Sequence, residues 1–273
     1  MLKLTILQLF QVNKPQSATV PIVINFPHSG TYIPEDIKPN YNPVAIEFID
    51  DTDWFLPELY AFAKELGITT MQATHSRWVI DLNRNPESKP LYNDGRHITG
   101  LCSTTNFLGE AIYKQGMEPD QTEIDRRKKL YFEPYYEQLQ LVLDELKAKH
   151  DKVLLYDSHS IRSVVKTIKE ERFPDIILGT ADGKSANEKL INTALESLKS
   201  TPFQINYNDP FKGGNITRTF GRPAENQHAI QLERCKDLYM KNNETELDID
   251  KASLMSKHLR SLFENLIEQL NEI

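Results

Sequence analysis

The sequence predicts an α/β fold in which a mixed, largely parallel sheet is covered by helices on both faces. Short apolar runs rich in β-branched residues alternate along the chain with longer amphipathic segments, the pattern typical of this class. The chain has 273 residues, of which 39% are hydrophobic, enough for one sizeable core. We therefore predict a single domain over residues 1–273.

The N-terminal part of the chain contains four of the eight predicted strands. Residues 1–16 include an apolar run that is too short to span a membrane and has no small-residue cleavage site, so we interpret it as an edge strand. Apolar positions near a helical repeat predict a helix over 42–66, which Gly67 ends. Further strands are predicted at 21–26, 68–73 and 78–82.

The rest of the chain alternates strands and helices. Residues 83–117 are predicted to contain little helix, and a connection of this length suggests a functional loop region. A long helix is predicted over 120–150, because its acidic start and basic end suit the helix dipole. Strands are predicted at 153–156, 175–178, 204–207 and 229–232, and helices at 186–198 and 249–270.

Charge and cysteine content restrict the partners and the compartment. The net charge of −7 and the pI of 5.6 argue against nucleic acid or an anionic membrane as a main partner. Two cysteines, Cys102 and Cys235, are too few for a secreted disulfide framework, and we interpret them as free thiols. We therefore expect a soluble, cytoplasmic protein with a small-molecule substrate.

Reactive side chains follow three of the predicted strands. His28 comes after 21–26, His159 after 153–156 and Glu233 after 229–232. The carboxyl ends of parallel strands meet at one edge of a sheet, where ligands gather. Two imidazoles and one carboxylate are the usual ligands of a catalytic zinc, which also needs a second carboxylate as general base. Glu233 is one candidate carboxylate, and the other lies within residues 50–53, Asp-Asp-Thr-Asp.

Each of these features alone has a plainer explanation. A single histidine at a strand end is more often a hydrogen-bonded structural residue, and an acidic cluster near a helix start usually caps it. The chain contains neither HExxH nor CxxC, so the spacing by itself only weakly indicates a metal.

Two further segments could bind anions. Residues 76–84 end in Asn83-Arg84, and a guanidinium grips a carboxylate through two parallel hydrogen bonds. Residues 211–223 combine Gly213-Gly214 with Arg218 and Arg222, as in a carboxylate or phosphate loop or a simple turn. This second segment lacks the GxxxxGK[ST] pattern, which excludes a P-loop.

Taken together, these segments resemble the N-formylglutamate amidohydrolase family from about residue 20 to about residue 240. The resemblance is carried by PHSG at 27–30, DTDWFLPELYAFAKELG at 51–67, SRWVIDLNRNP at 76–86, KPLY at 89–92, DSHSIRS at 157–163, FKGGNITRTFGRP at 211–223 and QLE at 231–233. The family belongs to the wider zinc-carboxypeptidase and aspartoacylase-like group. That resemblance implies a three-layer α/β/α sandwich around a mixed sheet.

The resemblance also implies roles for individual residues. His28 and His159 match the zinc-binding histidines, Glu233 the general base, and Asn83 with Arg84 the pair that binds the substrate carboxylate. The wider group often has its acidic ligand three positions after the first histidine, where this chain has Thr31. A threonine cannot replace a carboxylate, so Asp53 is the preferred ligand and Asp51 the alternative.

The implied activity is zinc-dependent hydrolysis of N-formyl-L-glutamate to formate and L-glutamate, as in histidine degradation. Arg77 would help to stabilise the oxyanion, and one of Arg162, Arg218 and Arg222 would bind the second substrate carboxylate. Two alternatives stay open. The protein could be a related zinc hydrolase of another N-acyl amino acid or small peptide. It could also be a non-catalytic dicarboxylate-binding protein, which would bind without metal or turnover.

Overall fold

The computed structural model describes residues 8–15, 18–87, 89 and 100–273. The described residues form one seven-stranded sheet with the order β1-β3-β2-β4-β7-β5-β6. β1 pairs with β3, and β5 with β7, in antiparallel fashion, whereas β3-β2-β4-β7 and β5-β6 are parallel. The strands are β1 (Phe10–Asn13), β2 (Ile22–Phe26), β3 (Thr69–Ala73), β4 (Val153–Ile161), β5 (Ile176–Gly179), β6 (Ile205–Tyr207) and β7 (Gln227–Cys235).

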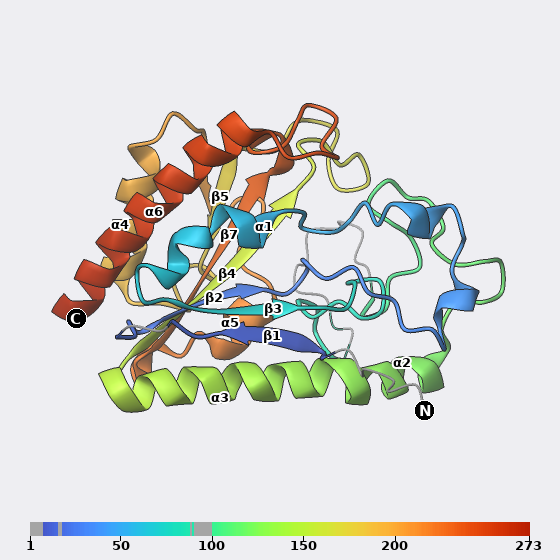
Figure 1. Ribbon diagram of the computed structural model, residues 1–273, viewed down its shortest axis with the longest axis horizontal. Helices are drawn as coiled ribbons and strands as arrows, with labels where there is room; N and C mark the ends of the chain where they lie inside the picture. The colour runs from blue at the N-terminus through green and yellow to red at the C-terminus, as the bar shows by residue number, and fades with distance from the viewer. Residues whose placement is uncertain (1–7, 16–17, 88, 90–99) are drawn as a thin grey trace.

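Helices cover both faces of this sheet, which confirms the predicted three-layer α/β/α class. α3 runs along one face, whereas α4 and α6 lie together on the other (Figure 1). The helices are α1 (Leu56–Leu59), α2 (Gln121–Arg127), α3 (Glu133–His150), α4 (Glu188–Lys199), α5 (Asn215–Phe220) and α6 (Ile249–Glu272). None of the helices within the described residues is long and apolar enough to cross a membrane.

The alternation of side chains along β4 decides which face carries the functional groups. Leu154 and Tyr156 pack into the core cluster that contains α4 and α6 residues, whereas Val153 and Leu155 pack against α3 residues. Side chains two apart on a strand share a face. Asp157 and His159 therefore project on the α3 side, near the carboxyl end of the sheet.

Two of the predicted elements are wrong. The segment 42–66 is not one helix but three short pieces, the four-residue α1 and two 3₁₀ turns at Ala45–Glu47 and Ala61–Lys64. Phe55 has φ 60°, which interrupts a right-handed helix. The Asp50–Asp53 loop before it is buried and bonded to other segments. The predicted strand 78–82 is irregular chain. Its apolar residues are buried against loops and helices, and Arg127 and Tyr136 bind the carbonyls of Val79 and Leu82.

The other predicted elements are found, some of them longer than expected. The helix predicted over 120–150 is α2 and α3, joined by a π-helical turn at Lys128–Phe132, and Asp120 caps it by accepting from the Glu123 amide. β4 and β7 extend past the predicted ends, so His159 and Glu233 lie within paired strands. Residues 100–117 contain no helix, while 88 and 90–99 lie outside the described residues. Cys102 and Cys235 are buried free thiols.

Candidate metal centre

Three of the residues predicted to bind a metal converge at the carboxyl end of the sheet. One ligand atom from each of His28, Asp53 and His159 lies within 4.8 Å of the others, and all three residues are buried. Asp53 Oδ2 is 3.2 Å from His159 Nδ1 and 3.8 Å from His28 Nδ1. The Asp53 amide also donates to the His28 carbonyl, at 3.0 Å, so the two loops hold each other in place.

The alternative acidic ligand, Asp51, lies elsewhere in the same loop. Its carboxylate accepts hydrogen bonds from Trp78 Nε1 at 2.8 Å and from the Phe107 amide at 2.9 Å. Asp51 therefore connects the acidic loop to the segments that carry Arg77 and Phe107. Of the two aspartates, the geometry favours Asp53 as the metal ligand.

Each histidine of the cluster contacts a buried carboxylate through its other ring nitrogen. His28 Nε2 lies 2.8 Å from Asp81 Oδ1, and His159 Nε2 lies 2.9 Å from Asp157 Oδ2. Metal-binding histidines are oriented in this way in many proteins. Both rings thus present Nδ1 to Asp53, and the buried His28 Nδ1 has no hydrogen-bond partner. The donor set and this unpaired nitrogen fit a divalent ion such as Zn²⁺.

Glu233 lies directly beside this cluster. β4 and β7 run parallel, with His159 and Glu233 as register partners, and Glu233 Oε1 is buried without a hydrogen-bond partner. Burial raises the pKa of Glu233 to about 7, and the nearby Asp53 charge adds to the rise. A carboxylate with this pKa can accept and return a proton near neutral pH.

Gly30 explains why the PHSG segment ends in glycine. A Cβ at this position would lie 2.4 Å from the His75 carbonyl oxygen, which no real side chain tolerates. The loop after β2 therefore runs in close contact with the chain after β3. This contact brings His28 next to the segment that carries Arg77, Asp81 and Arg84.

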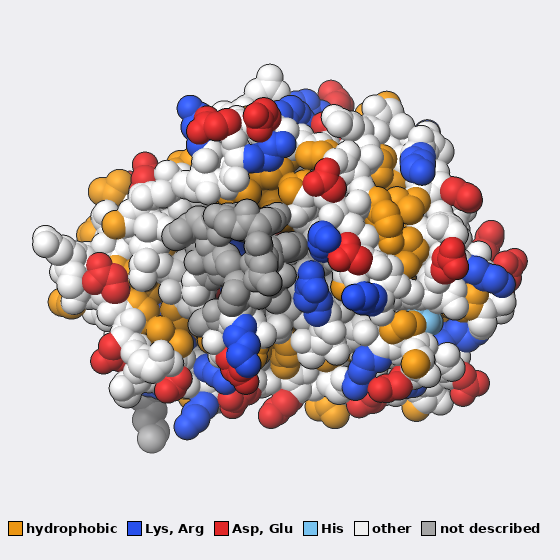
Figure 2. Space-filling model, turned by 180° about the vertical axis from the view of Figure 1, so that it is seen from behind, with side chains coloured by type: hydrophobic (Ala, Val, Ile, Leu, Met, Phe, Trp, Pro, Cys, Tyr) orange, Lys and Arg blue, Asp and Glu red, His pale blue; other side chains and the backbone are white. Residues whose placement is uncertain are grey.

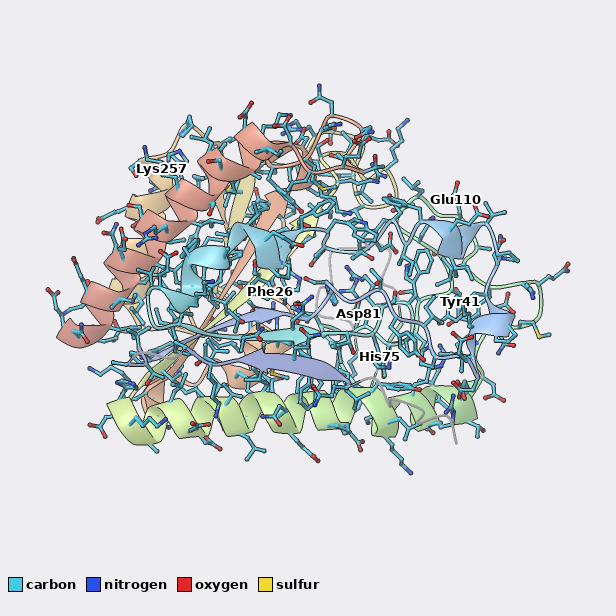
Figure 3. All side chains as sticks on the ribbon, viewed as in Figure 1. Phe26, Tyr41, His75, Asp81, Glu110 and Lys257 are labelled. Carbon is cyan, nitrogen blue, oxygen red and sulfur yellow. The ribbon has the colours of Figure 1, made fainter. Side chains whose placement is uncertain are left out.

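Asp81 joins a histidine of the cluster to two arginines. Its Oδ2 lies 2.7 Å from Arg77 Nη2 and 3.7 Å from Arg84 Nε, while Oδ1 contacts His28. Burial raises the pKa of Asp81, but the charges of Arg77 and Arg84 outweigh it and hold the pKa well below its usual range. Figure 3 shows Asp81 just beyond the ends of β2 and β3. We did not predict a role for Asp81, although it lies three residues before Arg84.

Arg84 lines a cavity of about 380 Å³ on this side of the molecule. Its side chain is 28% exposed, whereas that of Arg77 is 9% exposed and lies over the Phe107 ring at 4.8 Å. The cavity is lined by Arg84, Thr105, Asn106, Phe107, Gly109, Thr167 and Ile168. A cation therefore faces a largely apolar space near the cluster.

The side-chain amide of Asn83 contacts His159 through its nitrogen and the start of α5 through its oxygen. Nδ2 is 3.0 Å from His159 Nε2 and 3.3 Å from Gln231 Oε1, and Oδ1 accepts from the Ile216 amide at 2.9 Å. These contacts join the ligand histidine to the start of α5. Substrate binding by Asn83 stays a prediction.

The structure separates the three arginines predicted to bind a second carboxylate. Arg162 pairs with Asp50 and with Glu244. Arg218 is exposed on α5, and its Nε donates to the Gly213 carbonyl at 3.0 Å. Arg222 forms an isolated β-bridge with Gln227, at the end of β7 opposite to Glu233. Gln227 and Glu233 are six residues apart along the strand (233 − 227), which corresponds to roughly 20 Å at a strand's rise per residue. Arg222 is thus not brought to the cluster.

Known proteins resemble this chain over most of its length. The family model described as N-formylglutamate amidohydrolase matches residues 20–240. N-formylglutamate deformylase of Pseudomonas putida is 38% identical over 82% of this chain and 84% of its own. The enzyme of the same name from Pseudomonas aeruginosa is 38% identical over 91% and 93%.

A solved structure shares the fold. The crystal structure of N-formylglutamate amidohydrolase from Ralstonia eutropha superposes with a TM-score of 0.78 at 23% identity, covering 97% of this chain and 98% of the other. Fold, site and relatives together define the class: the protein is a hydrolase with a three-layer α/β/α fold. Within that class, the chain belongs to the N-formylglutamate amidohydrolase family.

Proposed function

We propose that this protein is a zinc-dependent amidohydrolase that cleaves N-formyl-L-glutamate to formate and L-glutamate. The observation that supports this most strongly is the buried group formed by His28, Asp53 and His159, with the unpaired Glu233 carboxylate beside it. The names of the Pseudomonas relatives supply the substrate. A cytoplasmic location and a role in histidine degradation remain predictions.

In this proposal His28, Asp53 and His159 hold one Zn²⁺ through two imidazole nitrogens and one carboxylate oxygen. Such an ion lowers the pKa of water and polarises a carbonyl. The residues around it are arranged to keep the ligands fixed, because Asp81 and Asp157 orient the two rings and the acidic loop is bound by its neighbours.

Glu233 is proposed to move the proton. It accepts a proton from water as the water oxygen bonds to the formyl carbon, and it returns that proton to the nitrogen as the C–N bond breaks. Formate and glutamate then separate. Arg77 is proposed to stabilise the negative charge that develops on the formyl oxygen. The negative charge of the nearby Asp53 contributes to raising the pKa of both buried side chains, Arg77 and Glu233.

Arg84 is proposed to bind a substrate carboxylate, because its side chain lines the cavity and is 28% exposed. The substrate is a dicarboxylate and needs a second cation. Figure 2 shows Lys and Arg side chains gathered near the centre of one face, although the chain carries a net charge of −7. Arg218 and Arg162 remain the proposed second anchors.

The proposal is tested by measuring formate release from N-formyl-L-glutamate with and without a chelator. We expect hydrolysis that stops on metal removal and returns when Zn²⁺ is added. A panel containing N-acetyl-L-glutamate and an uncharged N-formyl amino acid then separates a deformylase from a related hydrolase. Binding of the dicarboxylate without turnover, with metal present, would overturn the proposal.

A further inference from the structure

A chain of buried hydrogen bonds runs from α3 to the ring of His159. The Tyr135 hydroxyl donates to Asn25 Oδ1 at 2.5 Å, and Asn25 Nδ2 donates to Asp157 Oδ1 at 2.8 Å. The other carboxylate oxygen of Asp157 lies 2.9 Å from His159 Nε2. Tyr135, Asn25, Asp157 and His159 are each no more than 3% exposed.

The sheet brings these side chains together. Asn25 on β2 and Asp157 on β4 are register partners in a parallel pair, so their side chains lie side by side. His159 is two residues further along β4, on the same face. Tyr135, at the start of α3, covers that face. Three separate elements thus supply one continuous row of polar groups within an apolar layer.

Each group in the row forces the orientation of the next. The Asp157 carboxylate only accepts hydrogen bonds, so the Asn25 amide turns its NH₂ toward Asp157 and its oxygen toward Tyr135, whose hydroxyl donates to it. For the same reason His159 Nε2 donates to Asp157 and carries a proton. Asn83 Nδ2, which lies 3.0 Å from this nitrogen, has Gln231 Oε1 at 3.3 Å and Asp157 Oδ2 at 3.4 Å as acceptors for its own two protons. The lone pair of the neutral ring is then on Nδ1, which faces Asp53. The row selects the tautomer that a metal ligand requires.

The two aspartates behind the histidines differ in one respect. Asp81 is paired with Arg77, whose guanidinium offsets its charge. The side chains that contact Asp157 within the described residues are Asn25, Asn83 and His159. Among the described residues no Lys or Arg forms an ion pair with Asp157, so its carboxylate acts on His159, and such a partner raises the basicity of a ligand.

We propose that Tyr135 and Asn25 are positioning residues for the metal centre: they fix Asp157, which orients His159 with Nδ1 toward the ion. This inference rests on the proposed metal site. Neither residue is one of the proposed ligands. Their contribution is to hold one ligand in its binding orientation from the interior of the α3 layer.

The test is the Zn²⁺ affinity of the Tyr135→Phe protein, measured by competition with a chromogenic chelator. We expect binding about tenfold weaker than in the wild type, at the lower end of the effect known for residues that support metal ligands. Tyr156→Phe is the matched control, because it removes a buried hydroxyl from β4 on the opposite face, where Tyr60 is its neighbour. Its affinity should stay within twofold of the wild type.

A double-mutant cycle separates this role from a general loss of packing. If Tyr135 acts through Asp157, adding Tyr135→Phe to Asp157→Asn should weaken Zn²⁺ binding by less than twofold further. The rise in melting temperature that Zn²⁺ causes depends on its affinity for the folded protein, so thermal unfolding checks the same quantity. Asn25→Ala is a second variant that interrupts the row. Unchanged affinity in Tyr135→Phe and Asn25→Ala, or fully additive losses, would overturn the inference. Failure of the wild type to bind Zn²⁺ would instead refute the proposed metal site.

Discussion

His159 on β4 and Glu233 on β7 are register partners across two neighbouring parallel strands. One is a proposed metal ligand and the other the proposed general base, so the spacing of the sheet itself sets the distance between them. Strands in a sheet lie about 4.8 Å apart. Because both side chains come from paired backbone and not from loops, the geometry is fixed before any ligand binds.

Replacing the base should separate binding of the metal from turnover. Glu233→Gln keeps the size of the side chain but removes its ability to accept a proton. We expect turnover to fall at least ~10²-fold, with the Zn²⁺ content unchanged. Steady-state kinetics together with metal analysis of the purified variant checks this. Wild-type turnover in Glu233→Gln would remove Glu233 from the role.

The acidic loop offers a comparison between two buried aspartates. Asp53→Asn replaces the carboxylate beside both imidazoles with a neutral amide, a much weaker ligand, and should reduce the Zn²⁺ affinity at least ~10-fold. Asp51→Asn should leave Zn²⁺ binding intact, because Asp51 contacts Trp78 and Phe107 instead. Chelator competition measures both. The opposite ranking of the two variants would make Asp51 the ligand.

Arg84→Ala removes a partly exposed guanidinium and should affect acidic substrates selectively. A bidentate arginine–carboxylate pair is lost, so we expect kcat/KM for N-formyl-L-glutamate to fall about 10- to 100-fold, mainly through KM. The value for an uncharged N-formyl amino acid should change little. Arg260→Ala on α6, where Arg260 pairs with Glu65 and Glu264, is the matched control. Equal losses for both substrates would reject the carboxylate role of Arg84.

The sequence was informative where a local pattern determined the structure. The apolar runs before His28, His159 and Glu233 predicted strands, and those strands do bring the three residues together. It failed at 42–66, where apolar spacing suggested a helix. There the buried Asp50–Asp53 loop is held by distant partners such as Arg162 and Lys236, and such tertiary contacts leave no periodic signal.

The supporting groups were harder to find than the ligands. Asp81, Asn25 and Tyr135 act through side chains that are far away in the sequence, so only the assembled sheet shows their role. The same holds for the distal position of Arg222. In the sequence Arg222 follows the pair Gly213-Gly214, a pattern seen in anion-binding loops. In the structure α5 separates the two, and Arg222 lies beside the amino end of β7.

His228 should make the protein lose stability in mild acid. This residue is 3% exposed, and its Nδ1 accepts a hydrogen bond from the Asn187 amide at the start of α4. Burial, helped by the charge of Lys152, lowers the pKa of His228 from 6.5 to about 4. Between these two values the unfolded chain binds a proton that the folded protein does not. The stabilising contribution is therefore complete above pH 6.5 and is lost as the pH falls toward 4.

The slope is at most about 1.4 kcal/mol per pH unit for one proton. In His228→Phe this proton is absent, so the free energy of unfolding should fall less between pH 7 and pH 5 than it does in the wild type. Urea denaturation at the two pH values measures the difference, and comparing each protein with itself removes the constant effect of losing the Asn187 hydrogen bond. Because His228 lies near the amino end of β7, far along the strand from Glu233, activity at pH 7 should not follow this change. Parallel pH profiles for the two proteins would show that His228 is protonated equally in the folded and unfolded states.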